Sequence, residues 1–323
     1  MIFDQIDKLG RNRTPFFFMI DYDCRNAVVL PLSELASNGI SIEFNLSKYG
    51  QKVQSVSTHA HRVDIQPLQK DTYSNSFSKV QNEIQAGNSY LLNLTFPTVV
   101  RTKYTLEDMY SVAKASYKLY YKDKFVFFSP EAFVRIKDNK IYSYPMKGTI
   151  DASVPDALNI LMDSTKELYE HYTIVDLIRN DLALVSKNVV VERFRYHEKI
   201  ETASKRQIYQ TSSTIRGELD ESWKDNIGSM LKKILPAGSI SGAPKSKTLE
   251  IIKSAEIDNR GFYSGVTGIF EGDTLESCVN IRFIEQIAEG EYRYRSGGGI
   301  TCNSDCQEEY KELITKVYVP SLF

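Results

Sequence analysis

Cysteine and histidine are both scarce in this chain, with four of each among 323 residues. The cysteines are Cys24, Cys278, Cys302 and Cys306, which are too few and too widely separated to form a disulfide scaffold. Cys302 and Cys306 lie close together, but no second pair of cysteines or histidines lies near them to complete a zinc site. We therefore expect reduced thiols and no structural zinc.

A strong net charge and a long apolar run are also missing. The formal net charge is -1, with 42% hydrophobic and 25% charged residues, a balance typical of soluble globular proteins. Such a balance argues against binding to nucleic acid or to a membrane surface. The N-terminus has no basic segment followed by an apolar stretch, so we expect no signal peptide, no transmembrane span and a cytosolic location.

The spacing of apolar residues predicts a mixture of strands and helices. The length allows about two domains, or one large unit built on a mixed sheet. Short apolar runs at 16–20 and 27–30 predict that residues 1–75 form strands integrated with a catalytic body at 76–323. We expect helices at 76–86 (ending at Gly87), 106–119 and 164–182, with Leu168, Tyr172, Val175 and Leu182 as the apolar stripe of the last one. We expect strands at 90–95, 125–128, 132–136, 141–144, within 189–217, and at 263–270, 276–284 and 292–295.

A polar loop at Asp138 and Asn139 predicts a β-hairpin. If the loop also includes Lys140, Glu131 lies directly opposite Lys147, and directly opposed residues share one face with Cβ atoms about 5 Å apart. A two-residue loop would shift the register by one position and separate the two faces. A carboxyl group and a lysine therefore flank one small space in the first arrangement, either as a structural ion pair or as a functional pair.

Lys147 stands between a proline and a glycine in the stretch 143–149, Ser-Tyr-Pro-Met-Lys-Gly-Thr. A lysine beside apolar and backbone groups loses part of the stability of its ammonium form, and the neutral amine is a nucleophile that can form a covalent intermediate. A solvated loop lysine is the alternative that these residues alone leave open.

Two predicted helices each carry a pair of glutamates three positions apart, which places both members on one face. The pairs are Glu167 with Glu170, and Glu309 with Glu312 on a last helix that Ser304 is expected to cap. Magnesium takes one or two carboxylates and completes its octahedron with water and substrate oxygens. Each pair alone is compatible with a solvated helix face, but their joint occurrence beside glycine-rich loops indicates a magnesium site.

Two segments rich in glycine suit the binding of a small anion. The loop 235–245 opens a helix with Pro244 near its first position, and the spacing of Gly238 and Lys245 does not match a Walker loop. Exposed backbone N–H groups at such a loop suit an anionic ligand, although a plain turn is equally compatible. The run Gly297 to Gly299 follows a strand and favours close approach of the backbone to a ligand.

An ordered set of motifs carries a family resemblance over residues 75–318. The motifs are 145–149 (P-M-K-G-T), 167–181 (E-x-x-E-H-x-x-I-V-D-L-I-R-N-D), 238–245 (G-S-I-S-G-A-P-K), 263–268, 281–282 and 297–316. Together they resemble the chorismate-utilising enzymes, which include the anthranilate, aminodeoxychorismate, isochorismate and salicylate synthases. The resemblance implies an α+β fold in which two antiparallel sheets stack face to face and are flanked by helices.

Position 147 discriminates between branches of that family. Anthranilate synthases resemble this stretch with alanine in place of Lys147, whereas aminodeoxychorismate synthases carry lysine there. In that branch the lysine attacks C2 of chorismate as the C4 hydroxyl leaves, ammonia adds at C4, and the lysine is expelled. Glu131 matches the general acid that protonates the departing hydroxyl. Isochorismate and salicylate synthases place a water-activating lysine at the position of Leu91, so that branch is disfavoured.

The resemblance also implies binding roles for further residues. Glu170 and Glu312 would bind Mg2+, with Glu167 and Glu309 as second members of the cluster, and the metal would neutralise the ring carboxylate. The residues implied in substrate binding are Arg282, Tyr263, Lys316, Gly298 and Gly299 at the carboxylates, Ser241 and Gly242 along the ring, and Thr149 in the lysine motif.

Three positions depart from the family pattern: Gln210 replaces a histidine, Leu91 a glutamine and Ser241 a threonine. The short N-terminal portion shows no clear counterpart of the tryptophan feedback site, which favours the folate branch. The resemblance therefore implies synthesis of 4-amino-4-deoxychorismate, on the route to 4-aminobenzoate and folate, with ammonia from a separate glutamine amidotransferase subunit. Anthranilate synthase component I and a catalytically silent chorismate-binding paralogue are the alternatives.

Overall fold

Two antiparallel β-sheets form the centre of the computed structural model, which describes residues 2–45, 47–55, 60–201, 207–319 and 322. The first sheet has the spatial order β11 (Met146–Asp151), β13 (Gln207–Glu218), β10 (Lys140–Ser143), β9 (Ala132–Lys137), β16 (Leu275–Val279), β15 (Val266–Phe270), β1 (Phe16–Ile20) and β2 (Ala27–Pro31), with β12 (Lys187–Glu201) also paired to β13. The second has the order β14 (Gly242–Ala243), β6 (Leu91–Thr102), β18 (Glu291–Ile300), β17 (Phe283–Ala288), β8 (Phe125–Ser129), β7 (Tyr117–Tyr121), β3 (Ile40–Phe44) and β4 (Ser47–Tyr49), with β5 (Val63–Gln66) paired to β6.

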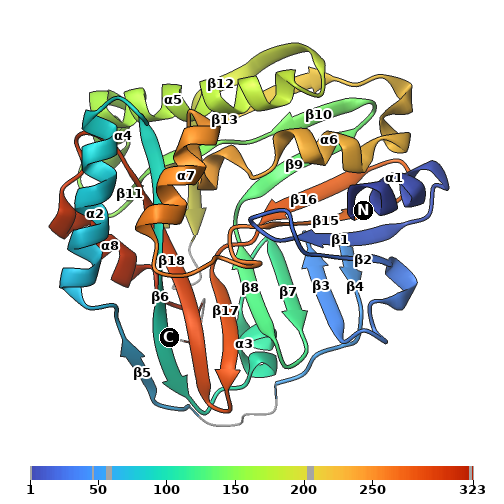
Figure 1. The fold of residues 1–323 in the computed structure, drawn as a ribbon, viewed down its shortest axis with the longest axis horizontal. Coiled ribbons are helices and arrows are strands. Elements are labelled where there is room, and N and C mark those ends of the chain that lie inside the picture. Colours follow the sequence, from blue (N-terminus) through green and yellow to red (C-terminus); the bar gives the residue numbers. More distant parts are fainter. Residues whose placement is uncertain (1, 46, 56–59, 202–206, 320–321, 323) are drawn as a thin grey trace.

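Helices cover the outside of the two sheets (Figure 1). They are α1 (Ile2–Arg11), α2 (Lys70–Gln85), α3 (Leu106–Val112), α4 (Ala157–Asp163), α5 (Thr165–Ala183), α6 (Ile227–Ile234), α7 (Lys245–Ala255) and α8 (Cys306–Thr315), with short 3-10 turns η1 (Leu32–Glu34), η2 (Glu221–Asp225) and η3 (Gly238–Ile240). Among the described residues, no helix combines the length and the apolar character needed to span a bilayer.

The strand β1 explains why the two sheets stack. Its side chains alternate between two apolar clusters, because Phe17 and Met19 pack on one side and Phe16, Phe18 and Ile20 on the other. The cluster that contains Phe17 also contains side chains of β3, β7, β8 and β17 from the second sheet. A strand that is buried on both faces needs a continuous apolar run. The predicted fold class, two stacked antiparallel sheets flanked by helices, is confirmed.

Several boundaries differ from the sequence-based expectations. The first 75 residues contain the helix α1 and residues 70–75 of α2 as well as strands. The helix expected at 106–119 ends at Val112 and gives way to β7, and the strand expected at 276–284 is broken at Arg282, which has a positive φ of 53°. The glycine run lies inside β18 rather than after it. Asp305, not Ser304, caps α8 by accepting hydrogen bonds from the backbone N–H groups of Gln307 and Glu308.

The hairpin has a two-residue loop, so the expected pairing of Glu131 with Lys147 is wrong. Asp138 and Asn139 both have positive φ, as a type I′ turn requires, and Lys140 pairs with Lys137. Lys147 belongs to the next strand, β11, which pairs with β13 instead of β9. The apolar stripe of α5 is also displaced, because Tyr172 is 52% exposed and stacks on Phe194.

A buried ion pair joins β6, η3 and the end of α7. The side chains of Arg260 and Glu256 are 1% and 5% exposed and lie 2.6 Å apart. Arg260 also donates to the carbonyl oxygens of Ile240 (2.7 Å) and Asn93 (2.6 Å), while Glu256 accepts from the backbone and hydroxyl of Thr95. The pair therefore fixes the relative positions of two backbone segments that belong to different elements.

Replacing Glu256 by alanine leaves the Arg260 guanidinium buried without its counter-charge. We expect the free energy of unfolding to fall by about 3–5 kcal/mol, read from the urea midpoint at constant slope. The control is Glu250→Ala on α7, which removes an exposed partner of Lys247 and should change the same quantity by about 1 kcal/mol or less. Equal losses in the two variants would contradict the role of the buried pair.

Candidate active site

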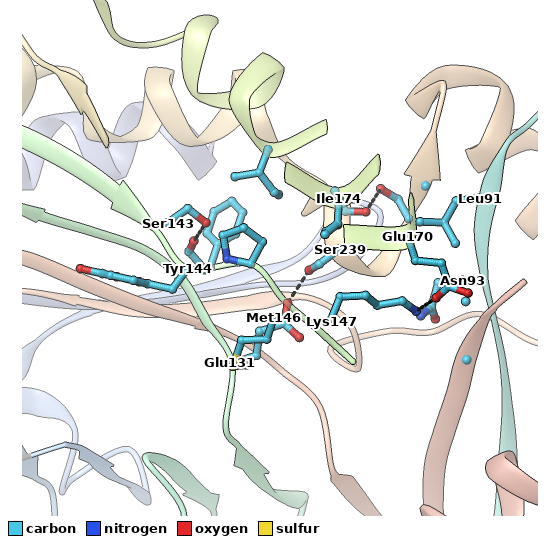
Figure 2. A pocket seen from close by; sticks show the side chains of 18 of the residues that line it. Leu91, Asn93, Glu131, Ser143, Tyr144, Met146, Lys147, Glu170, Ile174 and Ser239 are labelled. Atoms are coloured by element: carbon cyan, nitrogen blue, oxygen red, sulfur yellow. Dashed lines mark hydrogen bonds and ion pairs between the residues drawn. The ribbon is translucent and has the colours of Figure 1, made fainter. Parts of the chain in front are cut away.

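Lys147 lies on β11 at an irregular point of the strand. The pairing of β11 with β13 shifts register between Met146 and Thr149, so Lys147 and Gly148 form a bulge. The hydroxyl of Thr211 on β13 donates a hydrogen bond to the Lys147 carbonyl oxygen and holds this bulge in place. The Lys147 side chain lines a cavity of about 190 Å³ that opens between the two sheets' edges and α5 (Figure 2).

Gly148 allows α5 to approach the bulge. Its φ of +90° is a conformation that L side chains rarely adopt, and a Cβ placed on it would lie 2.8 Å from Glu167 Oε2. Glycine adopts this φ without strain, whereas a side chain here would be strained and would have to push aside the tip of Glu167. Gly148 therefore leaves room for the Glu167 carboxyl group beside the bulge.

The ammonium group of Lys147 lies among several carboxylates. Its Nζ is 2.8 Å from Glu170 Oε2. Burial alone would lower the pKa of Lys147, but Glu170, Glu167 and Glu312 together raise it above the ordinary value. Burial and the charge of Glu170 raise the pKa of Glu167. The isolated site therefore favours the ammonium form of the lysine and concentrates negative charge around it.

Glu131 lies across the same cavity, between β8 and β9 (Figure 2). Its carboxyl Oε1 accepts a hydrogen bond of 2.5 Å from the hydroxyl of Ser239 on η3. Burial raises the pKa of Glu131, although the Ser239 hydroxyl and the Arg282 guanidinium both act to lower it. A carboxyl group with a raised pKa retains its proton at higher pH and can act as a general acid.

The last helix brings Glu312 to the cavity, while Glu309 on the same helix, like Glu167 on α5, lies beside the lining rather than in it. Glu312 lines the cavity, and a Cβ added to Gly298 would lie 3.1 Å from Glu309 Oε2 and 3.7 Å from Glu312 Oε1. Burial and the charge of Glu312 raise the pKa of Glu309 despite a hydrogen bond from Ser304. Lys316 contacts Glu312 Oε1 at 2.6 Å and donates to the Gly297 carbonyl oxygen at 2.7 Å.

The loop before α7 and the start of β6 form another wall. Ser241 is fully buried and donates its hydroxyl to the Ala237 carbonyl oxygen at 2.9 Å. Gly242 pairs with β6, and a Cβ there would lie 2.0 Å from the Leu91 carbonyl oxygen. Leu91 and Gly299 face Lys147, since a Cβ on Gly299 would lie 3.1 Å from Leu91 Cδ1 and 3.8 Å from Lys147 Nζ.

Some residues singled out from the sequence lie outside the lining of this cavity. Thr149 is exposed farther along β11, and Gln210 donates to the sulfur of Met146 at 2.6 Å. Tyr263 is 4% exposed within the apolar core. Arg282 lies close enough to Glu131 to lower its pKa, and its Nε donates to the Tyr318 hydroxyl at 3.2 Å.

Several residues that sequence reasoning did not select also line the cavity, among them the polar residues Ser239, Asn93 and Tyr144. Ser239 stands in the glycine-rich motif 238–245, so that motif was the available signal. Asn93 shares the cavity face of β6 with Leu91 because strand residues two apart point the same way.

The donor chemistry of the cavity fits a hard divalent cation. Glu170 from α5 and Glu312 from α8 line it together, and each has a further glutamate three positions earlier. Within the described part of the chain, no group of three or more Asp, Glu, His or Cys side chains converges as a closed metal cluster. Magnesium needs only one or two carboxylates when water and substrate oxygens supply the remaining ligands, so two glutamates that line one cavity are sufficient.

Comparisons with known proteins show which family the chain resembles. A family model described as chorismate binding enzyme matches residues 34–321. The uncharacterized PabA-like protein of Pasteurella multocida (strain Pm70) is 52% identical over 319 residues, which are 98% of this chain and 97% of that protein. The 2-amino-4-deoxychorismate synthase of Streptomyces globisporus is 28% identical over 263 residues, covering 76% of this chain and 51% of that protein.

Among solved structures, the menaquinone-specific isochorismate synthase from Escherichia coli superposes with a TM-score of 0.75 at 16% identity, covering 97% of this chain and 79% of that chain. At this identity the likeness concerns the fold alone.

Replacing Gly148 by alanine tests the close approach of α5 to β11. Gly87 is the matched control, because its φ is +78° but a Cβ there would have no neighbour within 4 Å. Gly87→Ala should cost about 1–2 kcal/mol of unfolding free energy from backbone strain alone. Gly148→Ala should cost that amount and about 1 kcal/mol more at most, because its Cβ also displaces the ends of the Glu167 and Leu161 side chains. A smaller loss in urea denaturation than for Gly87→Ala would contradict the contact with Glu167.

Proposed function

Because this chain belongs to the chorismate binding enzyme family, we propose that it converts chorismate and ammonia to 4-amino-4-deoxychorismate and water through a covalent adduct on Lys147. The observation that carries the proposal is the placement of Lys147 Nζ and the Glu131 carboxyl in one cavity. A nucleophile and a general acid on either side of a ring can form one bond as another breaks.

Lys147 acts as the nucleophile once its ammonium has lost a proton. Glu170 Oε2, at 2.8 Å, is the acceptor within reach. The neutral amine then forms a bond to C2 of chorismate. The ring double bonds shift, and the C4–O bond breaks with its electron pair on oxygen.

Glu131 supplies the proton for this departure, so the hydroxyl leaves as water. Its raised pKa suits that role, because a general acid must hold its proton at the pH of turnover. Ammonia then adds at C4, the bond to C2 breaks, and Lys147 recovers its electron pair with the proton that ammonia releases. The proton taken up by Glu170 returns through solvent to Glu131, which restores the starting state. Leu91 provides no base beside Lys147 that could activate water as a competing nucleophile.

The remaining cavity residues hold the substrate. Lys316 and the backbone of Gly298 and Gly299 suit its carboxylates, with Arg282 adjoining. Ser241 and Gly242 form the wall along the ring. In this proposal Tyr263 and Thr149 support the substrate-binding residues from outside the cavity, since neither of them lines it.

Mg2+ belongs to the proposal as a cofactor held by Glu170 and Glu312, with Glu167 and Glu309 beside them. When bound, it supplies charge neutralisation at the ring carboxylate and strengthens electron withdrawal from the ring. The glutamates keep the site acidic enough to attract it. Ammonia comes from a separate glutamine amidotransferase in this account, and the product belongs to 4-aminobenzoate and folate synthesis.

Incubation of the protein with chorismate, Mg2+ and ammonium tests the reaction. We expect 4-amino-4-deoxychorismate, identified by chromatography and mass spectrometry. Lys147→Ala should reduce its formation by at least about 10²-fold, as expected for a residue that acts directly in the chemical step. The matched control is Lys187→Ala, because that lysine forms only an exposed pair with Asp220.

Anthranilate as the product would support anthranilate synthase component I instead. An amine on C2 would support the activity named for the Streptomyces globisporus relative. Binding of chorismate without any product would support a silent paralogue. A Lys147→Ala variant that turns over normally would exclude the covalent mechanism.

The metal site is tested by Glu312→Gln, which removes one anionic ligand from α8. We expect the affinity for Mn2+, used as a paramagnetic substitute for Mg2+ and measured by electron paramagnetic resonance, to fall at least about tenfold. Glu308→Gln is the control on the same helix, because Glu308 is exposed and lies outside the cavity. Unchanged Mn2+ affinity in Glu312→Gln would remove this residue from the proposed metal site.

A further inference from the structure

Ser239 is the side chain that holds the proposed general acid. It stands on η3, within the loop that runs from α6 to α7, whereas Glu131 stands between β8 and β9. The Ser239 hydroxyl donates to Glu131 Oε1 at 2.5 Å (Figure 2). This contact joins elements that are more than a hundred residues apart, so it is not a product of local turn chemistry.

The two oxygens of the Glu131 carboxyl have different surroundings. Oε1 is held by Ser239, whereas Oε2 has no hydrogen-bond partner within the described residues. The backbone of Glu131 is itself fixed, because its N–H donates to Ser129 Oγ at 3.1 Å and its carbonyl oxygen accepts from the Val279 N–H at 3.1 Å. The side chain therefore presents one anchored and one free oxygen to the cavity.

We infer that Ser239 is a positioning residue for the proposed reaction, which holds Glu131 Oε1 so that Oε2 delivers the proton to the departing hydroxyl of chorismate. The inference rests on the proposed function. As the C4–O bond breaks, its electron pair goes to oxygen, the proton moves from Oε2 to that oxygen, and the carboxylate gains a negative charge. The Ser239 hydroxyl donates to that carboxylate and stabilises it, since hydrogen bonds to a charged acceptor are the stronger ones.

Neighbouring groups set the charge of Glu131 together with Ser239. Arg282, from the connection between β16 and β17, favours the carboxylate. Cys278 on β16 stays neutral, because burial raises the pKa of its thiol well above the ordinary value. Lys147 on β11 lies across the cavity and pairs with Glu170 rather than Glu131. Loss of the Ser239 hydroxyl therefore changes the pKa of Glu131 without removing a charged group from the site.

The second serine of the loop has a different task. Ser241 points back to its own loop, because its hydroxyl donates to the carbonyl oxygens of Ala237 and Gly238. Ser239 makes no such local bond among the described residues and turns to Glu131 instead. Ser241 thus stabilises its own loop, whereas Ser239 positions the acid.

The variants that test the inference are Ser239→Ala, which removes the donor, and Ser239→Thr, which keeps it. In Ser239→Ala we expect kcat with chorismate and ammonium to fall about tenfold or more with little change in KM, because a displaced acid impairs the chemical step. The donor favours the charged carboxyl, so its loss raises the pKa of Glu131 and moves the basic limb of the kcat profile to higher pH. Ser239→Thr should restore both properties.

A second measurement separates this inference from the proposed reaction. Difference infrared spectra of the free protein, with Glu131→Gln as the reference that identifies the carboxyl band, report the ionisation of Glu131 without turnover. We expect that band to persist to higher pH in Ser239→Ala than in the wild type. An unchanged titration, or a Ser239→Thr variant as impaired as Ser239→Ala, would overturn the positioning role. If the wild type makes no 4-amino-4-deoxychorismate, but the carboxyl band of Glu131 still persists to higher pH in Ser239→Ala than in the wild type, the proposed reaction alone is overturned.

Discussion

The ion pair between Lys147 and Glu170 is the interaction around which the cavity is built. It places an ammonium group among carboxylates from two helices that are distant in sequence, α5 and α8. Side chains at Gly148 and Gly298 would press on the tips of Glu167 and Glu309, so glycine at both positions leaves these carboxyl groups room beside the strands. The glycines, the bulge in β11 and the two acidic helix faces are therefore parts of one arrangement, whose purpose is to concentrate charge in a small space.

The same arrangement explains how a lysine and an acid remain available for chemistry. Carboxylates raise the pKa of Lys147, so the resting site stores an ammonium ion and a proton acceptor side by side. Burial raises the pKa of Glu131, which keeps a proton on the other side of the cavity. The walls between them are rigid, because Arg260 and Glu256 tie the backbone of Asn93 to that of Ile240. Fixed walls hold the reacting groups in place, which is where much of the advantage of an enclosed site comes from.

Strand and helix periodicities in the sequence predicted individual elements, in runs such as 16–20 and 164–182, whereas the stacking of two sheets was implied by the family resemblance. The sequence also predicted the two glutamate pairs, because residues three apart on a helix share a face whatever the surrounding fold. It could not predict that α5 and α8 meet at one cavity, since this depends on strand order in both sheets. The sequence likewise predicted the helix α5 but not which side of it is buried. Packing against β12 and β13 sets the rotation of α5 about its axis, and this leaves Tyr172 exposed and His171 buried.

The hairpin register shows how a sound local rule can give a wrong contact. Asp138 and Asn139 marked the turn, but the loop length decided which residues face each other, and both lengths were compatible with the sequence. Glu131 and Lys147 nevertheless share a cavity, because the chain crosses from β10 to the edge strand β11 after Pro145. Ser239 escaped notice for a related reason: its partner lies in another element, and no spacing rule connects them.

The most direct test of the central claim is the intact mass of the protein after mixing with chorismate and Mg2+ in the absence of ammonia, followed by peptide mapping. The account predicts an added mass equal to chorismate less one water, located on the peptide that contains Lys147, and its disappearance when ammonium is supplied. An unmodified protein that still forms 4-amino-4-deoxychorismate once ammonium is added would contradict the account.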